Sequence, residues 1–538
     1  MDRSSNPIDR SGPKHRCRDD VFDQRLESAA KSQQLRYRHA PQAQTPPDQQ
    51  QKTPLGANPK DVTENVMRAQ SLAMRLPAAQ HRSTHQQQHD QRGVPPRSHG
   101  RSHVAPRRRR RFRRHIVHRV PALWYLPLDS KGRLAHPTKQ GNPMDQIVIV
   151  SGVRTPVGKF QGSLSDVSAT RLGAVAVREA VQRAQLRPEQ IEECIMGNVV
   201  SAGLGQNPAR QAAIFGGLPP EVSAVTVNMV CGSGLRAIAL GAQSIQTGNS
   251  DIVVAGGMES MTNAPYLLPQ ARSGFRMGNA VAVDSMVNDG LWDVYNDFHM
   301  GQTAELVAEK YNITREDQDC FALMSHKKAA AAWREGRFAA EIVPVEIPAK
   351  KKGQPPTLFE RDESIREDTT IETLRALKPA FKKDGTVTAG NAPGVNDASA
   401  AVVIMSGAKA RELGLTPMAR IVAHATSGID PKWVMMAPVN GARKAMERAG
   451  WTIDSIDLFE FNEAFAAQAL AVTRELGVPQ DKVNVNGGSV AIGHAIGASG
   501  ARVLVTMMHE MIRRNVHRGL AALCLGGGNS VAMCIERG

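Results

Sequence analysis

The sequence lacks the features that would direct a chain out of the cell or into a membrane. No segment approaches the roughly 18 consecutive apolar residues that a transmembrane helix needs, and no charged-then-apolar signal peptide opens the chain. Only six cysteines occur among 538 residues, widely spaced and without a CxxC pair. That pattern excludes the disulfide framework of a small secreted domain. These absences predict a soluble, cytoplasmic protein without a membrane partner.

Acidic residues are scarce at the start of the chain. Residues 1–143 hold 28 Lys and Arg against 11 Asp and Glu, which accounts for the whole net charge of +16. This segment is rich in Gln, Pro, Ser and His and cannot bury enough apolar surface to offset the entropy of ordering, so we predict a disordered basic extension. Its arginine run, residues 107–111, suits nucleic acid or acidic lipid, but a solvated tail is the favoured interpretation.

Another interpretation of the extension starts from Met144, which stands just before the first clear strand pattern at residues 146–150. The native protein could begin at this methionine, with the preceding stretch an artefact of start-site choice. A mitochondrial transit peptide fits less well, because such peptides are poor in acidic residues and this segment has eleven.

From Met144 onward, apolar runs typical of strands alternate with helical patterns. Within residues 235–245, for example, the apolar side chains recur on one helical face. Strands that alternate with helices predict α/β layers around a buried sheet. The apolar runs span residues 147–150, 225–230, 252–255, 401–405, 421–423, 456–461 and 520–525.

The region after Met144 also repeats itself. Arg183 and Ile191 recur as Arg448 and Ile456, both at an offset of 265, and each pair marks a helix that runs into a strand. We therefore predict two related α/β halves, residues 144–410 and 411–538. Residues 261–390 have no counterpart in the second half and are predicted to form an inserted loop domain.

Cys231 is the first candidate for chemistry. It follows the apolar run 225–230 and precedes the glycines at 232 and 234, at the predicted start of a helix. A thiol at a helix N-terminus meets free backbone N–H groups and the positive end of the dipole, which favours its thiolate. Cysteine is also a common inert residue in cores, so this context alone leaves both interpretations open.

Three further segments join small residues to a reactive or polar side chain. His494 lies in a stretch of glycines and alanines that leaves room for a ligand at its imidazole. Cys524 ends an apolar run just before the glycines at 526–528. Asn462 and Glu463 interrupt another apolar run at its end. A structural hydrogen-bonding role is equally open for these last two residues.

Together these segments resemble the active-site blocks of the thiolase family. The resemblance covers residues 144–538, including the opening RTPVGKF at 154–160, and the blocks follow in the family's order. The four blocks are VNMVCGSGL at 227–235, NEAFA at 462–466, GHAIGASG at 493–500 and CLGGG at 524–528.

The resemblance implies a role for each residue of the site. Cys231 attacks an acyl-CoA carbonyl while His494 takes its proton, which gives an acyl-enzyme. Cys524 then removes a proton from the α-carbon of a second acetyl-CoA. His494 and a water held by Asn462 stabilise the enolate, and the backbone N–H groups of Cys231 and Gly526 stabilise the tetrahedral intermediate.

The resemblance also implies a coenzyme A site, with CoA thioesters as substrates and no tightly bound cofactor or catalytic metal. Arg366 would meet the nucleotide and Phe381 the pantetheine arm. Tyr295 would help to hold a potassium ion, as in some relatives. Pro393 stands where biosynthetic members often carry a serine that contacts pantetheine, a bond that proline cannot make. The expected CoA and acyl contacts are His299, Met300, Arg366, Thr373, Phe381, Ala389, Ala464 and Phe465.

The leading functional hypothesis is the reversible Claisen condensation of two acetyl-CoA to acetoacetyl-CoA plus CoA, because the His299–Met300 pair resembles the short-chain form of the family. A broader 3-oxoacyl-CoA thiolase of fatty-acid degradation is the nearest alternative. A non-catalytic thiolase-like lipid carrier and a nucleic-acid binder acting through the tail are the others. The family implies a homo-oligomer, a dimer or tetramer assembled through residues 267–284.

Overall fold

The structure is a computed structural model that describes residues 146–349, 351 and 353–538. The predicted extension over residues 1–143, with its arginine run, lies outside the described residues, so its disorder and its binding partners stay predictions. None of the helices in the described part of the chain is long and apolar enough to cross a membrane.

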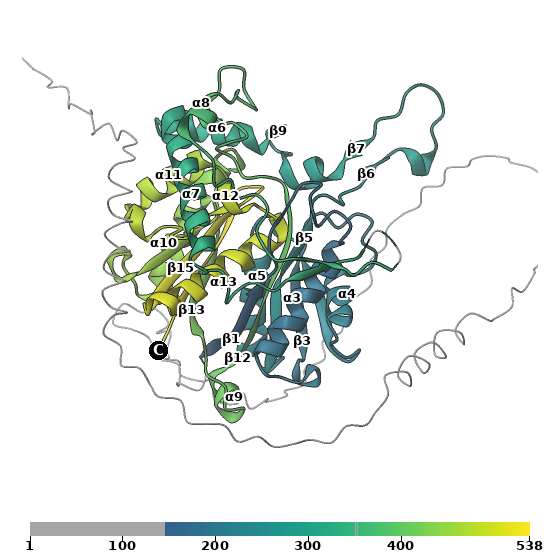
Figure 1. The fold of residues 1–538 in the computed structure, drawn as a ribbon, viewed down its shortest axis with the longest axis vertical. Helices are drawn as coiled ribbons and strands as arrows, with labels where there is room; N and C mark the ends of the chain where they lie inside the picture. Colours follow the sequence, from purple (N-terminus) through teal and green to yellow (C-terminus); the bar gives the residue numbers. More distant parts are fainter. Residues whose placement is uncertain (1–145, 350, 352) are drawn as a thin grey trace, which may run out of the picture. The chain divides into compact units, whose positions relative to one another are not determined.

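Ten strands form one mixed sheet in the order β14-β15-β16-β13-β1-β12-β5-β3-β4, with β2 paired to β12 (Figure 1). The strands that precede residue 410 are β1 (Ile147–Arg154), β2 (Gly158–Lys159), β3 (Glu193–Gly197), β4 (Ser223–Val227), β5 (Ile252–Ser260) and β12 (Asn396–Ser406). The later strands are β13 (Ala419–Gly428), β14 (Leu458–Phe461), β15 (Arg518–Leu525) and β16 (Asn529–Glu536).

The pairing pattern of the sheet repeats. In the first half, β1, β12 and β5 pair antiparallel and β5 then pairs parallel with β3. In the second half, β13, β16 and β15 pair antiparallel and β15 then pairs parallel with β14. The halves meet where β1 pairs antiparallel with β13. The predicted duplication of an α/β layered fold is therefore confirmed.

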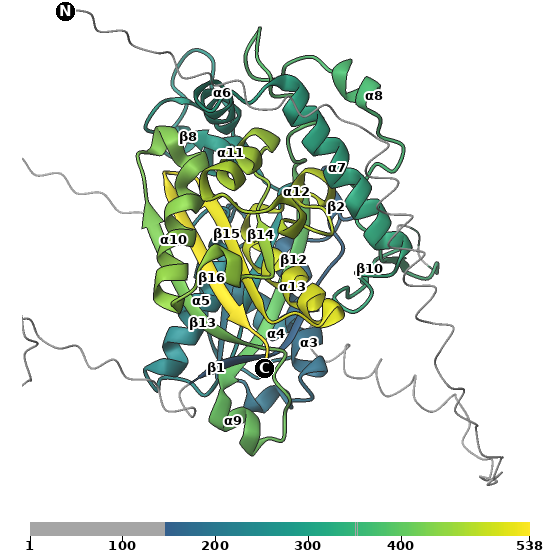
Figure 2. The same cartoon turned by 90° about the vertical axis from the view of Figure 1, so that its left-hand side faces the viewer.

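Helices cover both faces of the sheet. On the outer faces, α3 (Ala169–Arg183) and α4 (Pro208–Phe215) pack on the first half, and α10 (Ala437–Ala449) packs on the second, as Figure 2 shows. Between the halves lie α5 (Ser233–Gln246) and α13 (Ile496–Arg514), which contact strands of both. Strand β12 accordingly sends Val402 toward the central helices and Val403 toward α3, and both are buried. Burial on both faces is why its sequence is continuously apolar.

Glycines let the two central helices approach closely. A methyl group at Gly234 would lie 2.8 Å from the backbone nitrogen of Ala501, and one at Gly500 would lie 2.5 Å from that of Leu235. One at Gly257, on β5, would lie 2.1 Å from the carbonyl oxygen of Gly497. Only hydrogen fits at these positions. The N-terminal ends of α5 and α13, where the candidate residues lie, are thus held next to each other.

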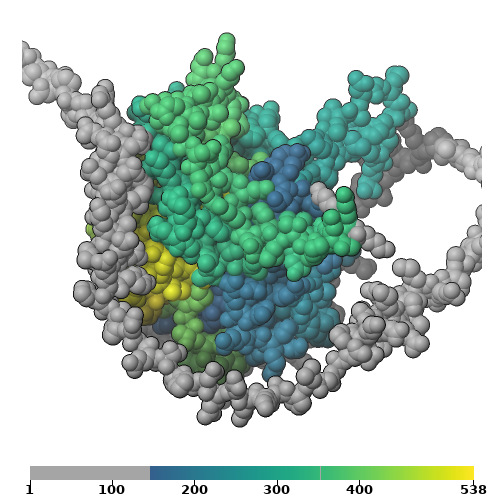
Figure 3. All heavy atoms as spheres, viewed as in Figure 1, coloured from purple at the N-terminus to yellow at the C-terminus, as the bar shows by residue number. Residues whose placement is uncertain are grey.

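The chain between β5 and β12 leaves the sheet. Its hairpin of β6 and β7 stands out from the rest of the described residues in Figure 3. The elements of this segment are β6 (Tyr266–Leu267), η3 (Ala271–Ser273), β7 (Val283–Asp284), η4 (Met286–Leu291), β8 (Trp292–Asp293), β9 (Phe298–His299), α6 (Met300–Lys310), α7 (Arg315–Arg334), β10 (Val345–Ile347), β11 (Thr357–Phe359) and α8 (Ile371–Arg375). The other elements are η2 (Pro188–Gln190), α9 (Gly407–Glu412), η5 (Pro431–Met436), η6 (Ile453–Ser455), α11 (Ala466–Leu476), η7 (Gln480–Lys482) and α12 (Ser489–Ile492).

Candidate active site

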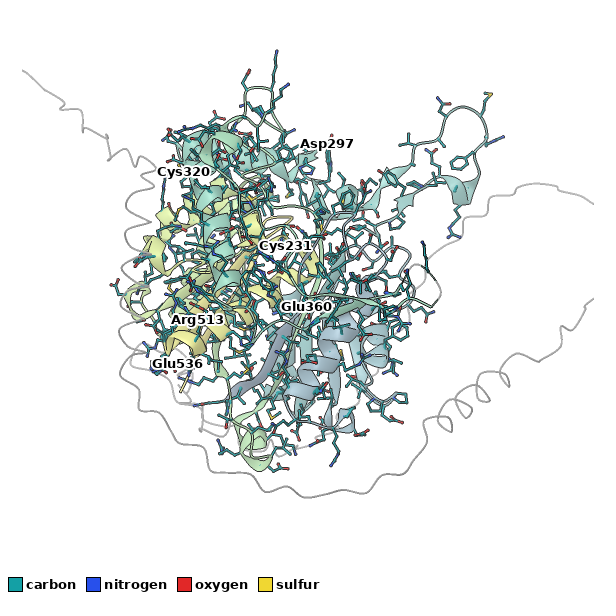
Figure 4. The ribbon with its side chains drawn as sticks, in the orientation of Figure 1. Cys231, Asp297, Cys320, Glu360, Arg513 and Glu536 are labelled. Atoms are coloured by element: carbon teal, nitrogen blue, oxygen red, sulfur yellow. The ribbon has the colours of Figure 1, made fainter. Side chains whose placement is uncertain are left out.

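Cys231 stands on a tight turn between β4 and α5 (Figure 4). The preceding residue, Val230, has a φ of 47°, a left-handed conformation that is rare for a β-branched side chain. Two side chains stabilise the turn. The Ser233 hydroxyl donates to the Val230 carbonyl (2.6 Å) and accepts from the Met229 N–H (2.9 Å), and Asn228 Oδ1 accepts from the Val230 N–H (3.0 Å). Strain of this kind is typical of a functional position.

The helix N-terminus by itself does not make Cys231 a thiolate at rest. Although part of the residue remains accessible, the surrounding protein raises the pKa of its thiol to about 11. The backbone N–H groups of Gly526 and of Cys231 itself lower that pKa, but by less than burial raises it. The cost of burying a charge therefore outweighs the helix N-terminus. The resting thiol is protonated, so a base must take its proton.

Cys524 lies near the end of β15, close enough to Cys231 for the charges of the two thiols to interact. Its thiol is buried and its pKa is raised well above the ordinary range, first by burial and then by the charge of a Cys231 thiolate. The loop that follows contacts the nucleophile's turn, because a methyl group at Gly526 would lie 3.2 Å from Val230 Cγ1. Two thiols and the Gly526 N–H thus share one site.

His494 is held as a neutral base. Its Nδ1 lies 2.7 Å from the Ser499 hydroxyl, which itself donates to the Ala495 carbonyl (2.9 Å). Because that hydroxyl proton is used, Nδ1 carries the hydrogen and Nε2 is the free base. Burial, helped by the charge of Arg502, lowers the pKa of His494 to about 3.

Backbone contacts bring His494 to the nucleophile. Its N–H donates to Asn396 Oδ1 (2.8 Å), and its backbone pairs with Val395. Val395 and Ile496 pack in the same apolar cluster as Cys231. The base and the nucleophile are therefore held in the same part of the fold although 263 positions separate them in the sequence.

We expect acylation by acetyl-CoA to show no ionisation near the ordinary histidine pKa of about 6.5. With a pKa of about 3, His494 stays neutral through mildly acidic pH and loses its function as a base only when pH falls toward that value. Quenched-flow release of CoA, measured between about pH 5 and pH 8, checks this. A step in the rate near pH 6.5 would place an ordinary histidine in the reaction and contradict the assignment.

The structure separates Asn462 from Glu463, which the sequence could not. Asn462 Oδ1 accepts from the Ser489 hydroxyl (2.7 Å), but its Nδ2 is buried without a hydrogen-bond partner among the described residues. Glu463 instead accepts from Ser325 (2.8 Å), Asn484 (2.8 Å) and the Val490 N–H (3.0 Å). Glu463 is a structural hydrogen-bonding residue, whereas Asn462 has a donor, Nδ2, that no described residue uses.

Five of the eight expected acyl and CoA contacts come together. The His299 ring stacks on Phe381 with centroids 4.8 Å apart, and Phe381 meets Phe465 edge-on at 6.1 Å. Met300 and Ala464 pack in the same core cluster as Phe465 and Cys524. His299 also begins α6, since its Nδ1 accepts from the Gly301 N–H (3.0 Å). This cluster packs beside Cys524.

The other three expected contacts, Arg366, Thr373 and Ala389, are exposed. The Thr373 hydroxyl donates to the Thr370 carbonyl within α8 (2.8 Å), a local capping bond. The Arg366 side chain is exposed, while its backbone N–H donates to His326 Nδ1 (3.2 Å). Ala389 is exposed as well. Their contact with CoA stays a prediction.

Glu259 supports the site and was missed in the sequence. Glu259, at the end of β5, accepts from Asn198 Nδ2 (2.7 Å) and from the N–H groups of Val199 (3.0 Å) and Gly497 (3.0 Å). It therefore ties the first turn of α13 to the segment beside Cys231. Burial raises its pKa to about 8, and the backbone donors act in the opposite direction. In the sequence, the only sign of its role was the presence of an acidic residue within an apolar strand.

No group of three or more His, Cys, Asp or Glu in residues 146–349, 351 and 353–538 is arranged to hold a metal ion. Tyr295, the expected potassium contact, has a side chain that is 70% exposed and lies near Gly527. The potassium contact of Tyr295 therefore stays a prediction.

Comparison with known proteins gives a consistent result. The chain matches the thiolase N-terminal domain over residues 147–408 and the thiolase C-terminal domain over 415–537. It is 58% identical to an acetyl-CoA acetyltransferase of Cupriavidus necator and 55% identical to one of Pseudomonas aeruginosa, in both cases over 394 residues that cover 73% of this chain and 100% of the relative. The crystal structure of the Bacillus anthracis acetyl-CoA acetyltransferase matches with a TM-score of 0.72 and 45% identity, covering 74% of this chain and 100% of that one.

Proposed function

Because this chain belongs to the thiolase family, we propose that it is an acetyl-CoA acetyltransferase, an acyltransferase that condenses two acetyl-CoA to acetoacetyl-CoA and CoA and runs the reverse thiolysis. The observation that carries this proposal is the pair of interacting thiols, Cys231 and Cys524, with the Gly526 N–H at Cys231 and the neutral His494 held against the same apolar cluster. One thiol serves as the nucleophile and the other as an acid and base at carbon.

Acylation begins with proton transfer from Cys231 to His494 Nε2. The sulfur attacks the acetyl carbonyl, and the N–H groups of Cys231 and Gly526, which already point at this sulfur, stabilise the oxyanion that forms. The C–S bond to CoA then breaks. The departing CoA thiolate takes the proton of Cys524, which leaves an acetyl-cysteine, a Cys524 thiolate and an imidazolium.

Condensation uses that ion pair. The Cys524 thiolate removes a proton from the methyl carbon of a second acetyl-CoA, and the enolate oxygen is stabilised by His494 Nε2–H and by a water bound to Asn462 Nδ2. The carbanion attacks the acetyl carbonyl on Cys231. The Cys231 thiolate leaves and recovers its proton from His494, so both thiols and the imidazole return to their resting states.

The leading proposal and its alternative, a broader 3-oxoacyl-CoA thiolase, differ in the length of the acyl chain that the site accepts. The stacked His299 and Phe381, with Met300 beside them, support a closed wall and a short acyl group. Pro393, which removes an expected pantetheine contact, favours the broader 3-oxoacyl-CoA thiolase. The CoA thioester contacts of Arg366, Thr373 and Ala389 are part of the proposal in either case.

We expect acetoacetyl-CoA to be cleaved with a kcat/KM at least about tenfold above that of a long-chain 3-oxoacyl-CoA, because a poorly fitting methylene typically changes the rate by about 10- to 200-fold. The test is a thiolysis series over increasing chain length with the full chain, followed by loss of absorbance of the 3-oxoacyl-CoA. Faster cleavage of the long chain would favour the alternative.

The proposal extends to assembly and location. We infer a homo-oligomer, a dimer or a tetramer, built through the hairpin of residues 267–284, where Met277 is 98% exposed and Phe275 and Val281 are also exposed. A projecting apolar arm is typical of a protein interface. The cytoplasmic location is an expectation that the bacterial relatives support. Potassium at Tyr295 rests on the family resemblance alone, and no step of the reaction uses it.

A further inference from the structure

The orientation of the Asn462 amide decides whether it can serve an oxyanion. A side-chain amide has an acceptor oxygen and a donor nitrogen that are nearly equal in shape, so rotation by half a turn would present the oxygen instead. An oxygen facing an enolate would repel it. Something must therefore hold the amide with Nδ2 toward the substrate, and backbone contacts cannot do so because they do not touch the amide.

Ser489, the first residue of α12, sets this orientation through its single hydroxyl proton. Arg502 Nη2 donates to the Ser489 oxygen (2.9 Å), and the Ser489 oxygen lies 2.7 Å from Asn462 Oδ1. A guanidinium can only donate. The arginine occupies a lone pair of the hydroxyl, and the hydroxyl proton goes to Asn462 Oδ1. The flipped amide would leave that proton without an acceptor in a buried position.

Arg502 is an unusual residue to find in this place. It is only 3% exposed, in the second turn of α13, and its Nη1 has no hydrogen-bond partner within the described part of the chain. Burial lowers its pKa, while Glu460, two positions before Asn462 on β14, acts in the opposite direction. A buried cation with an unused donor is costly. Its cost argues for a role other than stability.

We propose that Arg502 and Ser489 form a positioning relay, running from α13 through α12 to the end of β14, that holds the Asn462 amide with its N–H toward the enolate oxygen. Helix α13 packs against β14 (Figure 2), and the Ser489 hydroxyl joins α12 to Asn462, the residue that follows β14. The inference rests on the proposed function, because it assigns the relay to the condensation half of that reaction. Both are positioning residues, since neither touches the substrate.

The test is Ser489→Ala, with Ser325→Ala as the matched control. Each serine is buried, donates to one side chain and accepts one N–H, but Ser325 bonds Glu463 (2.8 Å) and the Gly488 N–H (3.0 Å) and does not contact Asn462. We expect Ser489→Ala to lower kcat of condensation by about 10²- to 10³-fold, the effect of losing one oxyanion donor, with KM changed little. Ser325→Ala keeps kcat within a few-fold of wild type.

The acylation half-reaction distinguishes failure of the relay from failure of the proposed function. The Ser489→Ala enzyme still transfers one acetyl group from acetyl-CoA to Cys231, because the tetrahedral intermediate uses other donors. If the wild-type chain does not become acetylated, the proposed function is wrong, and the relay falls with it. If Ser489→Ala condenses acetyl-CoA as fast as wild type, only the relay is overturned.

A double-mutant cycle shows whether the relay acts through Asn462. In an Asn462→Ala background, Ser489→Ala causes no further loss of kcat, because the group it orients is already absent. An equal loss in both backgrounds would overturn the relay. Where Ser489→Ala does not fold, as judged by its loss of acylation, the same cycle is run with Ser489→Cys, which keeps the volume and a weak donor. Activity of Ser489→Cys between wild type and Asn462→Ala supports the relay, and wild-type activity contradicts it.

Discussion

Replacing Cys231 by serine lowers thiolysis and condensation by roughly 10⁴-fold or more, since removal of a catalytic nucleophile costs losses of this order. A serine hydroxyl at this position is a far weaker acid than the thiol, and a neutral imidazole whose own pKa is about 3 is too weak a base to deprotonate it. The strained turn at Val230 and the two N–H groups at position 231 remain in the variant. Without a reactive nucleophile they do not promote the reaction.

The measurement is the intact mass of the protein after mixing with acetyl-CoA, together with the steady-state rate. Wild type gains one acetyl group, which maps to the peptide that contains Cys231, and Cys231→Ser gains none. Cys534→Ala is the control, because Cys534 is also a buried free thiol but lies on β16, in the core. It keeps the acetyl group and most of the rate. Full activity in Cys231→Ser would refute the mechanism, and an unacetylated wild type would favour the non-catalytic lipid carrier.

Replacing Cys524 by alanine separates the two half-reactions. We expect acetylation of Cys231 to survive, because His494 and the two backbone donors are untouched and the departing CoA thiolate can take its proton from the His494 imidazolium in place of Cys524. Condensation falls by about 10²- to 10⁴-fold, the usual contribution of a general base. The buried Cys524 thiol has a pKa well above the ordinary range. It is therefore a weak acid whose conjugate thiolate is a strong base, suited to a proton on carbon.

Exchange of the methyl protons of acetyl-CoA in deuterated water measures this step directly. Wild type exchanges them once the acetyl-enzyme has formed, and Cys524→Ala does not. Cys194→Ala is the matched control, because Cys194 is equally buried but packs in the outer core of the first half. Retained exchange in Cys524→Ala would assign the carbon acid chemistry to another group, with His494 the remaining candidate.

The blocks that carry the site could be found in the sequence because each is contiguous. Asn462 follows β14, Cys524 lies near the end of β15, and Cys231 and His494 each stand two residues before a helix, so the apolar pattern and the glycines around them mark the position. The duplication was visible for the same reason, since the offset of 265 holds over a helix and the strand after it.

The residues that support the site could not be found in this way. Arg502 reads as a charged residue within a helix, and Ser489 as one of many small residues. Their role depends on two hydrogen bonds. Arg502 donates to Ser489, 13 positions away, and Ser489 donates to Asn462, 27 positions away. The carboxylate of Glu259 meets the Gly497 N–H across 238 positions. Hydrogen bonds of this span exist only once the sheet has brought the segments together.

The sequence by itself determined the family, the layered α/β fold, the repeat and the reactive groups of this chain, because strand and helix periodicity and short motifs are local. Only the tertiary structure decided the protonation states and the hydrogen bonds of these reactive groups. The helix N-terminus at Cys231 favours a thiolate, but packing of the surrounding segments raises the pKa of the thiol to about 11 and keeps the proton on sulfur. The same packing keeps His494 neutral and leaves one donor of Asn462 free. Solvent exclusion is a property of segments that meet in space, and no stretch of sequence contains it.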